Sequence, residues 1–144
     1  MNEKTASWLD SSAVLTLLYA EPGMDFVRRL LEQAERQTIT VYLSAVSLAE
    51  IVSSIVKSHG DEIARDDLRL VLEMPVQIES PTWEQCAAGG WLRAGHKLST
   101  ADAVIAAQAL AANAELVHKD PEFDRVPGLK HRRLPYKSKA VRKR

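Results

Sequence analysis

The stretch of residues 98–124, LSTADAVIAAQALAANAELVHKDPEFD, constrains the fold of this 144-residue chain most strongly. It predicts an alanine-rich helix, a short buried strand over Glu115–Val117, and then a loop. Ser99 stands three residues before Asp102, which is the spacing of a capping box, so we expect Asp102 in the first helical turn. Open α/β sheets bind ligands at the carboxyl ends of their strands. We therefore expect the carboxylates of Asp102 and Asp120 to meet near one strand end.

The rest of the chain alternates between strand and helix patterns. Runs of β-branched and aromatic residues predict strands, and apolar residues at helical spacing predict helices. The expected strands are Ala6–Leu9, Thr38–Leu43, Val76–Ile78 and Arg132–Leu134. The expected helices are Ala13–Tyr19, Met24–Gln37, Ala45–Ser58, Asp61–Glu73, and one that Ser80 and Pro81 open and that runs to Gly95. This alternation predicts an α/β sandwich around a mainly parallel sheet.

Composition favours one cytoplasmic domain. A hydrophobic content of 46% is enough for a core without disulfide or metal support, and Cys86 has no second cysteine to pair with. No apolar run approaches the length of a membrane span, and residues 1–10 do not resemble a signal peptide. We expect a single folded domain over residues 1–135 and a short basic tail over residues 136–144.

The charges of the chain are segregated. Eight of the 19 Lys and Arg residues lie from Lys130 onward, where there is no acid. Residues 1–129 therefore hold 11 bases against 19 acids, a net charge of −8. A basic segment of this kind is typical of nucleic-acid contacts, and it is equally typical of a solvated tail.

Four carboxylates follow strands or lie in helices that start at the same sheet edge: Asp10, Glu50, Asp102 and Asp120. Each has an ordinary structural explanation when it is taken alone. Asp10 and Asp102 are suited to helix capping, Glu50 to a solvated helix face outside the apolar stripe, and Asp120 to a turn before a proline. The apolar stripe of that helix is Ala45, Leu48, Ala49, Val52, Ile55 and Val56.

Together the four acids indicate a metal site. Like charges repel, so a fold that gathers them benefits from a cation, and an all-carboxylate set favours Mg²⁺ or Mn²⁺. Such an ion orients water and neutralises charge on a phosphodiester. The spacing of the acids alone therefore predicts a metal-dependent phosphoryl-transfer enzyme.

Four segments carry a resemblance to a known family. LDSSAVLTLL at 9–18, SLAEI at 47–51, LSTADAVIAAQAL at 98–110 and LVHKDPEFD at 116–124 resemble the four motifs of the PIN-domain ribonucleases, and of the VapC-like toxins of type II toxin–antitoxin pairs in particular. The resemblance covers the chain to about Leu134. It implies a three-layer α/β/α fold, a pocket that binds Mg²⁺ or Mn²⁺, hydrolysis of RNA phosphodiester bonds, and a cognate antitoxin.

The resemblance also implies roles for the acids. It makes Asp10, Asp102 and Asp120 metal ligands, direct or through water, and Glu50 a ligand or a residue that positions water. Many members have Thr or Ser where this chain has His118, and the hydroxyl holds the first acid. We therefore expect His118 to donate a hydrogen bond to Asp10. A stand-in role for Asp124 beside a neighbouring acid is the lesser alternative.

Further expectations concern partners. Arg93, His96 and Lys97 are candidates for steering RNA, with ordinary solvated residues as the alternative. We expect a homodimer. We expect most Met, Trp and Leu side chains of the helices between residues 61 and 95 to be core, the others serving a dimer or antitoxin groove.

Two other classes of protein compete with the nuclease. A receiver-type phosphoacceptor domain also clusters acids on an α/β fold, but the expected strand Thr38–Leu43 is followed by Ser44 where such a domain needs an acid. A non-catalytic PIN-like module would instead bind nucleic acid or a partner through its basic tail.

Overall fold

A wholly parallel sheet forms the centre of the molecule. The computed structural model describes residues 5–136, and its sheet has five strands in the order β3-β2-β1-β4-β5. The strands are β1 (Thr5–Leu9), β2 (Ile39–Ser44), β3 (Gln77–Glu79), β4 (Glu115–His118) and β5 (His131–Arg133). Every neighbouring pair is parallel. The predicted α/β fold with a parallel sheet is confirmed.

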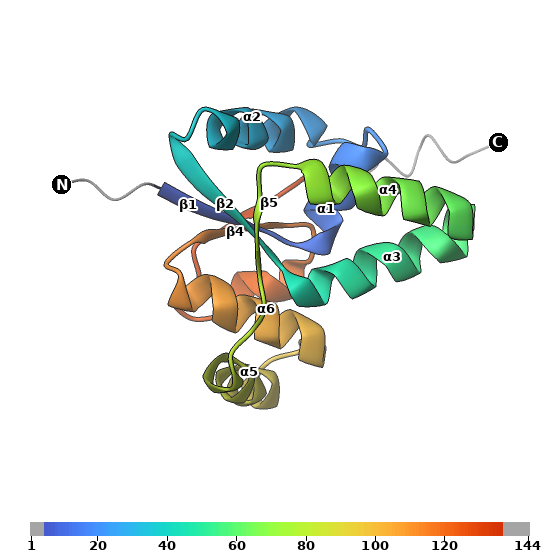
Figure 1. The fold of residues 1–144 in the computed structure, drawn as a ribbon. Helices are drawn as coiled ribbons and strands as arrows, with labels where there is room; N and C mark the ends of the chain where they lie inside the picture. Colours follow the sequence, from blue (N-terminus) through green and yellow to red (C-terminus); the bar gives the residue numbers. More distant parts are fainter. Residues whose placement is uncertain (1–4, 137–144) are drawn as a thin grey trace.

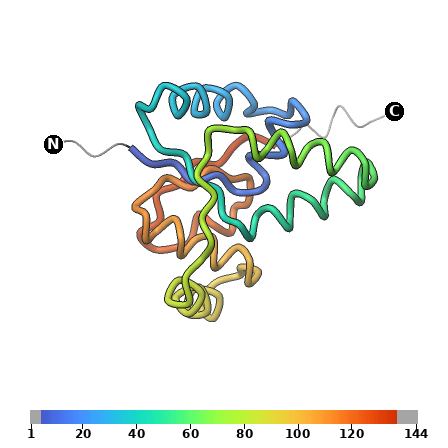
Figure 2. The backbone as a smooth tube through the Cα atoms, viewed as in Figure 1, coloured from blue at the N-terminus to red at the C-terminus, as the bar shows by residue number. Residues whose placement is uncertain are grey.

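Helices cover both faces of this sheet and give the three layers (Figure 1). They are α1 (Ser11–Leu18), α2 (Met24–Glu35), α3 (Ala45–His59), α4 (Asp61–Glu73), α5 (Trp83–Gly95) and α6 (Thr100–Ala111), followed by the 3₁₀ helix η1 (Pro121–Arg125). One buried core lies between the sheet and α1 to α4, and a second lies between the sheet and α5 and α6. Figure 2 shows α3 and α4 running side by side away from the sheet.

The observed elements agree with the predicted ones to within two residues at each end. Two details differ. The helix predicted to open at Ser80 and Pro81 begins after an N-cap at Thr82, whose side chain forms a full capping box with Gln85. The loop expected after β4 contains η1, which the sequence pattern did not predict.

The strand order changes direction between β1 and β4. The chain leaves β1 toward β2 on one side and returns to β4 on the other, which is a topological switch point of the kind where open α/β sheets bind ligands. The backbone N–H of Asp10 donates to the carbonyl of Val117 at this point (3.0 Å). Receiver-type domains have the order 2-1-3-4-5, so the observed order excludes that alternative.

Close packing of α5 on α6 places the start of α6. Gly89 is buried on α5, and a Cβ there would lie 3.0 Å from the backbone N and Cα of Val104 on α6. The residues of α6 are buried from Ala103 to Ala109. Small residues on both helices thus allow the approach that sets the position of Asp102.

The carboxyl-terminal cations divide between the sheet and the tail. Arg132 and Arg133 lie in β5, and Leu134 after them is buried in the core. Of the tail expected at 136–144, residues 137–144 lie outside the described residues. No helix among residues 5–136 is long and apolar enough to span a bilayer.

Candidate active site

Asp10 lies where β1 ends and α1 begins. Its carboxylate caps α1 by accepting hydrogen bonds from the backbone N–H and the hydroxyl of Ser12, at 3.3 and 2.6 Å. Only 6% of the residue is exposed. The capping role predicted for Asp10 is therefore real, and it holds the carboxylate at the switch point. Ser12 is a site residue that the sequence reasoning did not single out.

Glu50 lies in the second turn of α3 and points to the same sheet edge. The apolar stripe predicted for this helix was rotated from the true one, because the buried residues of α3 are Ser47, Ile51 and Ile55. Glu50 adjoins this buried face and is partly buried. The solvated position expected for a lone helical Glu is therefore wrong here.

Asp102 lies in the first turn of α6, as predicted. The Ser99 hydroxyl caps this helix by accepting the backbone N–H of Asp102 at 3.1 Å. The reciprocal half of the predicted capping box, from the Asp102 carboxylate to the Ser99 N–H, is not among the hydrogen bonds of residues 5–136. The Asp102 carboxylate is therefore available to the site.

Three of the four predicted acids meet. One carboxylate oxygen from each of Asp10, Glu50 and Asp102 lies within 4.8 Å of the other two. Asp10 Oδ1 and Glu50 Oε1 are buried and have no hydrogen-bond partner within the described part of the chain. Asp120 lies outside this group and caps η1, where its Oδ1 accepts the N–H of Glu122 at 2.9 Å.

The acids repel one another in the absence of a cation. Burial raises the pKa of Asp10, against the hydrogen bonds from Ser12, and the charge of Asp120 raises it further. Burial and then the charge of Asp10 raise the pKa of Glu50. Burial, followed by the charges of Asp10, Glu50 and Asp120, raises the pKa of Asp102 to about 7. Asp120 thus acts on the cluster electrostatically although it lies outside the group of three.

This donor set fits a hard divalent cation. Buried carboxylate oxygens without partners are costly, and an ion between them would satisfy them and cancel their repulsion. All three nearest groups supply oxygen and none supplies sulfur or nitrogen, which suits Mg²⁺ or Mn²⁺.

His118 does not bind Asp10, so that prediction is wrong. Its Nδ1 accepts the backbone N–H of Asp120 at 3.1 Å, and its Nε2 lies 3.2 Å from Nδ1 of His131. The ring is fully buried, and this burial, with the charge of His131, lowers its pKa to about 4. Ser12 supplies the hydroxyl bond to Asp10 that His118 was expected to replace.

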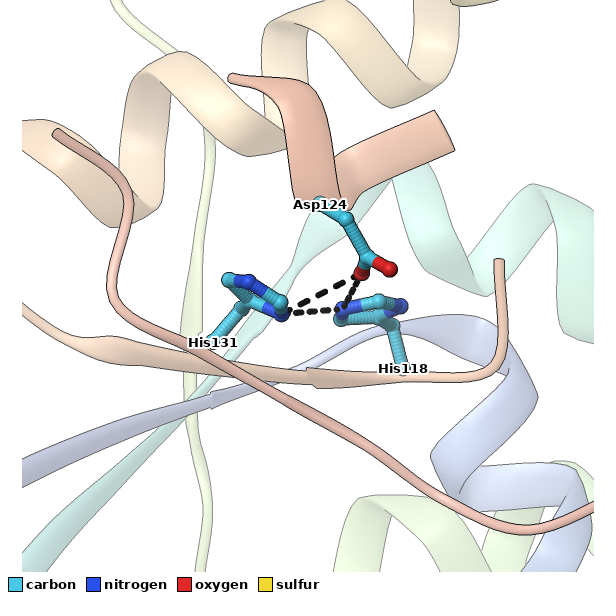
Figure 3. Close-up of side chains that lie close together, drawn as sticks. All are labelled: His118, Asp124 and His131. Atoms are coloured by element: carbon cyan, nitrogen blue, oxygen red, sulfur yellow. Dashed lines mark hydrogen bonds and ion pairs between the residues drawn. The ribbon is translucent and has the colours of Figure 1, made fainter. Parts of the chain in front are cut away.

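Asp124 belongs to a separate cluster rather than to the acidic one. Its Oδ1 lies 3.4 Å from His131 Nδ1 and 3.8 Å from His118 Nε2 (Figure 3). Its Oδ2 lies 3.4 Å from Nη1 of Arg133. The alternative of Asp124 as a stand-in acid is therefore not supported by its contacts.

Two cationic side chains, Lys97 and Arg125, line a cavity near the start of α6. Of the three predicted RNA-steering residues, His96 and Lys97 line this cavity of about 380 Å³, together with Arg125 and Glu122 of η1. Arg93 is exposed on the last turn of α5. Arg125 was not predicted, because η1 itself was not.

Large apolar side chains lie exposed on α4 and α5. Trp83 and Trp91 are 77% and 80% exposed, and Leu70 and Leu72 are also exposed. Met74 and Leu92 pack against the buried clusters, but none of the Met, Trp and Leu side chains between residues 61 and 95 is fully buried. The prediction that most of them belong to the core is therefore wrong. Trp91 and Leu92 also line an apolar cavity of about 690 Å³ against α6.

The fold and the acidic site define a class of protein. A family model of the PIN domain matches residues 8–129, so this chain belongs to the PIN domain family, a family of nucleases.

Solved structures place the chain beside VapC toxins within that family. A chain of VapBC2 from Rickettsia felis, solved with a promoter DNA fragment, is 25% identical with a TM-score of 0.75, and the match covers 91% of this chain and 100% of that one. A chain of a toxin–antitoxin complex from Klebsiella pneumoniae is 21% identical (TM-score 0.63, coverage 92% and 99%). VapC20 from Mycobacterium tuberculosis, a sarcin–ricin loop cleaving toxin, is 17% identical (TM-score 0.65, coverage 83% and 93%). No curated protein sequence matches the chain.

Proposed function

We propose that this protein is a metal-dependent endoribonuclease that hydrolyses RNA phosphodiester bonds, and that it is the toxin of a toxin–antitoxin pair. One observation carries the catalytic part of the proposal. Asp10, Glu50 and Asp102 converge within 4.8 Å, and two of their oxygens are buried without a partner in the described residues. Membership of a nuclease family supports the reaction class.

Each acid would have a defined task in this reaction. Asp10, Glu50 and Asp102 would hold Mg²⁺ or Mn²⁺, with Asp120 adding negative charge or a water-mediated contact from η1. When bound, the ion supplies an activated water and stabilises the charge that builds up on the phosphodiester. Ser12 keeps the Asp10 carboxylate in place through its 2.6 Å hydrogen bond. A strand end positions Asp10, the start of α6 positions Asp102, and the second turn of α3 positions Glu50, so little reorganisation is needed during the reaction.

The substrate would approach over the cationic cavity. Lys97 and Arg125 line it together with His96 and one acid, Glu122, next to the loop that leads to Asp102. Phosphate groups of RNA are attracted to such side chains, which would offset the repulsion between the substrate and the acids. The domain of residues 1–135 would thus contain both the chemistry and part of the RNA contact.

A cleavage assay tests the catalytic proposal. Purified protein is incubated with matched RNA and DNA oligonucleotides in Mg²⁺, in Mn²⁺ and in excess chelator. We expect cleavage of RNA with either metal and none in chelator, and loss of cleavage in Asp10→Asn. Asp66→Asn, an exposed acid paired with Arg69 on α4, is the matched control and should cleave as the wild type does. Undiminished cleavage in chelator would overturn the metal mechanism.

The partners follow from the same relatives. Two of the structures named above are of VapBC or toxin–antitoxin complexes, and this supports a cognate antitoxin for this chain. Trp83 and Trp91 are exposed on α5, which supports a protein partner on this surface, either a second copy of the chain or the antitoxin. Light scattering during gel filtration would show twice the chain mass for the homodimer, and a monomer at all concentrations would contradict it.

A further inference from the structure

His118 sits between the backbone of Asp120 and a second histidine. It ends β4, is fully buried, and is separated from Asp120 by Lys119 alone. One ring nitrogen faces Asp120 and the other faces His131, while Asp124 of η1 lies over both rings (Figure 3). The ring edge also contacts Phe123 of η1, with centroids 4.9 Å apart. The side chain therefore touches both the start and the middle of the segment that presents the fourth acid.

The hydrogen bond to Asp120 fixes where the ring carries its proton. Nδ1 accepts the Asp120 N–H at 3.1 Å, so its lone pair is occupied. A neutral imidazole has one N–H and one acceptor nitrogen, and the proton must therefore be on Nε2. That N–H points at Nδ1 of His131, 3.2 Å away, with the Asp124 carboxylate at 3.8 Å.

The same three side chains could be taken for a second metal site. His118 Nε2, His131 Nδ1 and Asp124 Oδ1 lie 3.2 to 3.8 Å from one another, a spacing that one ion could bridge. Ligation by Nε2, however, needs the lone pair on Nε2 and moves the proton to Nδ1. An Nδ1–H would then face the N–H of Asp120, donor against donor. The contact with Asp120 therefore opposes a metal ion here.

Three hydrogen bonds orient Asp120, one of them from the Phe123 backbone N–H to its carbonyl at 3.1 Å. His118 holds its backbone N–H, and its own Oδ1 accepts the N–H of Glu122 within η1. Without the bond to His118, the Asp120 N–H would have no acceptor, and the peptide between Lys119 and Asp120 could rotate. The direction of the Asp120 carboxylate toward the other acids depends on that peptide.

We infer that His118 is a positioning residue of the acidic site. It accepts the Asp120 N–H on Nδ1, and its Nε2–H donates to Nδ1 of His131, which holds the ring in that orientation. This inference rests on the proposed function, because positioning Asp120 matters only if the acids act together.

A first test uses the wild-type protein, with His131→Ala as the control for metal binding, and requires no RNA. Long-range ¹H–¹⁵N NMR correlations distinguish a protonated ring nitrogen from an unprotonated one, and the chain has only four histidines to assign. We expect His118 to be protonated on Nε2 alone and the Asp120 amide to exchange slowly with solvent. A proton on Nδ1, or stoichiometric Zn²⁺ binding that His131→Ala removes, would overturn the inference in favour of a metal site.

Two near-isosteric variants separate the two nitrogens in a second test. In His118→Asn the side-chain oxygen replaces Nδ1 and can still accept the Asp120 N–H, whereas in His118→Gln the amide replaces Nε2 and leaves Asp120 without its acceptor. His118→Leu removes both contacts. His59→Asn, an exposed histidine at the end of α3, is the control.

The readouts are Mn²⁺ affinity by calorimetry, and kcat and KM for RNA. We expect His118→Gln and His118→Leu to lose about tenfold in Mn²⁺ affinity, as is common when a group that orients a ligand is removed, and to lower kcat with little change in KM. His118→Asn should stay within about threefold of wild type. Equal losses in the Asn and Gln variants would overturn the inference. If wild type binds Mn²⁺ and shows the Nε2–H tautomer but cuts no RNA, the proposed function fails while the positioning contact stands.

Discussion

Asp102 is subject to two opposing electrostatic effects. The start of α6 favours its negative charge through the helix dipole, by up to about 1 kcal/mol. Burial and the charges of Asp10, Glu50 and Asp120 disfavour that charge, and the pKa of about 7 shows that they prevail. A residue that only capped the helix would be stabilised as a carboxylate. The electrostatics of Asp102 therefore match a ligand that awaits a cation.

Loss of a helix cap usually lowers the melting temperature, whereas Asp102→Asn should raise the melting temperature of the metal-free protein. A pKa raised from 3.8 to about 7 means that the folded state binds a proton more tightly than the unfolded state, so stability is lost as pH rises from about 4 to 7. The Asn variant lacks this loss. Its melting temperature relative to wild type should therefore increase from about pH 5 to pH 8, by roughly 3 °C for about 1 kcal/mol of screened repulsion.

Thermal melts of both proteins in chelator at several pH values check this. Taking the difference between the two proteins cancels the titration of shared groups outside the acidic cluster. Asp10 and Glu50 are coupled to Asp102, and their weaker repulsion in the Asn variant changes the difference in the same direction. A variant that melts lower than wild type at about pH 8 would identify Asp102 as a helix cap without a role in the cluster.

At the scale of the elements, the packing of α6 on α5 decides where Asp102 lies. Gly89 makes that approach possible, whereas a Cβ on Gly90 beside it would meet no atom within 4 Å. These adjacent glycines share one helix and differ only in what a Cβ would meet.

Gly89→Ala and Gly90→Ala should therefore act in opposite directions. Each gains about 1 kcal/mol in helix propensity. In Gly89→Ala the methyl group would meet the α6 backbone at 3.0 Å, so the helices must separate and the melting temperature should fall. Gly90→Ala should raise it by a few degrees. Equal shifts in the two melts would show that the close approach has no energetic weight.

The helices and strands could be predicted where the pattern of apolar residues is local. The site could be predicted where acids follow strands. Asp10 stands at a strand end and Asp102 at a helix start, so their meeting follows from a parallel sheet. Asp120, which was expected beside Asp102, instead caps η1 outside the group of three. The contacts of His118 could not be predicted, because its partner His131 lies on the neighbouring strand β5. Which residues of β4 and β5 face each other depends on the register of the two strands, in which His131 lies opposite Leu116. The rotation of α3 was missed because its buried face includes the polar Ser47.

At the scale of the whole molecule, the basic residues near the carboxyl terminus form two groups. One lies in and next to β5, and the other lies in residues 137–144. Removing everything from Lys130 onward would delete β5 and the buried Leu134, and so would damage the sheet rather than test the tail. Truncation must therefore begin after Tyr136.

Removal of residues 137–144 separates the enzyme from a tail-driven binding module. It deletes five cations and none of the acidic cluster. We expect kcat for RNA cleavage to be retained, while KM rises and depends less steeply on salt because fewer phosphate contacts are available. Complete loss of cleavage at saturating RNA would favour the non-catalytic module with a functional tail.

Titration of Mn²⁺ into the metal-free protein at about pH 8, followed by calorimetry, tests most directly whether the acids form a metal site. Wild type should bind the ion saturably, and the combined variant Asp10→Asn, Glu50→Gln and Asp102→Asn should lose more than about tenfold in affinity, since all three nearest carboxylates are neutralised. Asp66→Asn should bind as wild type does. The same isotherm for the combined variant and the wild type, or no binding by either, would contradict the account.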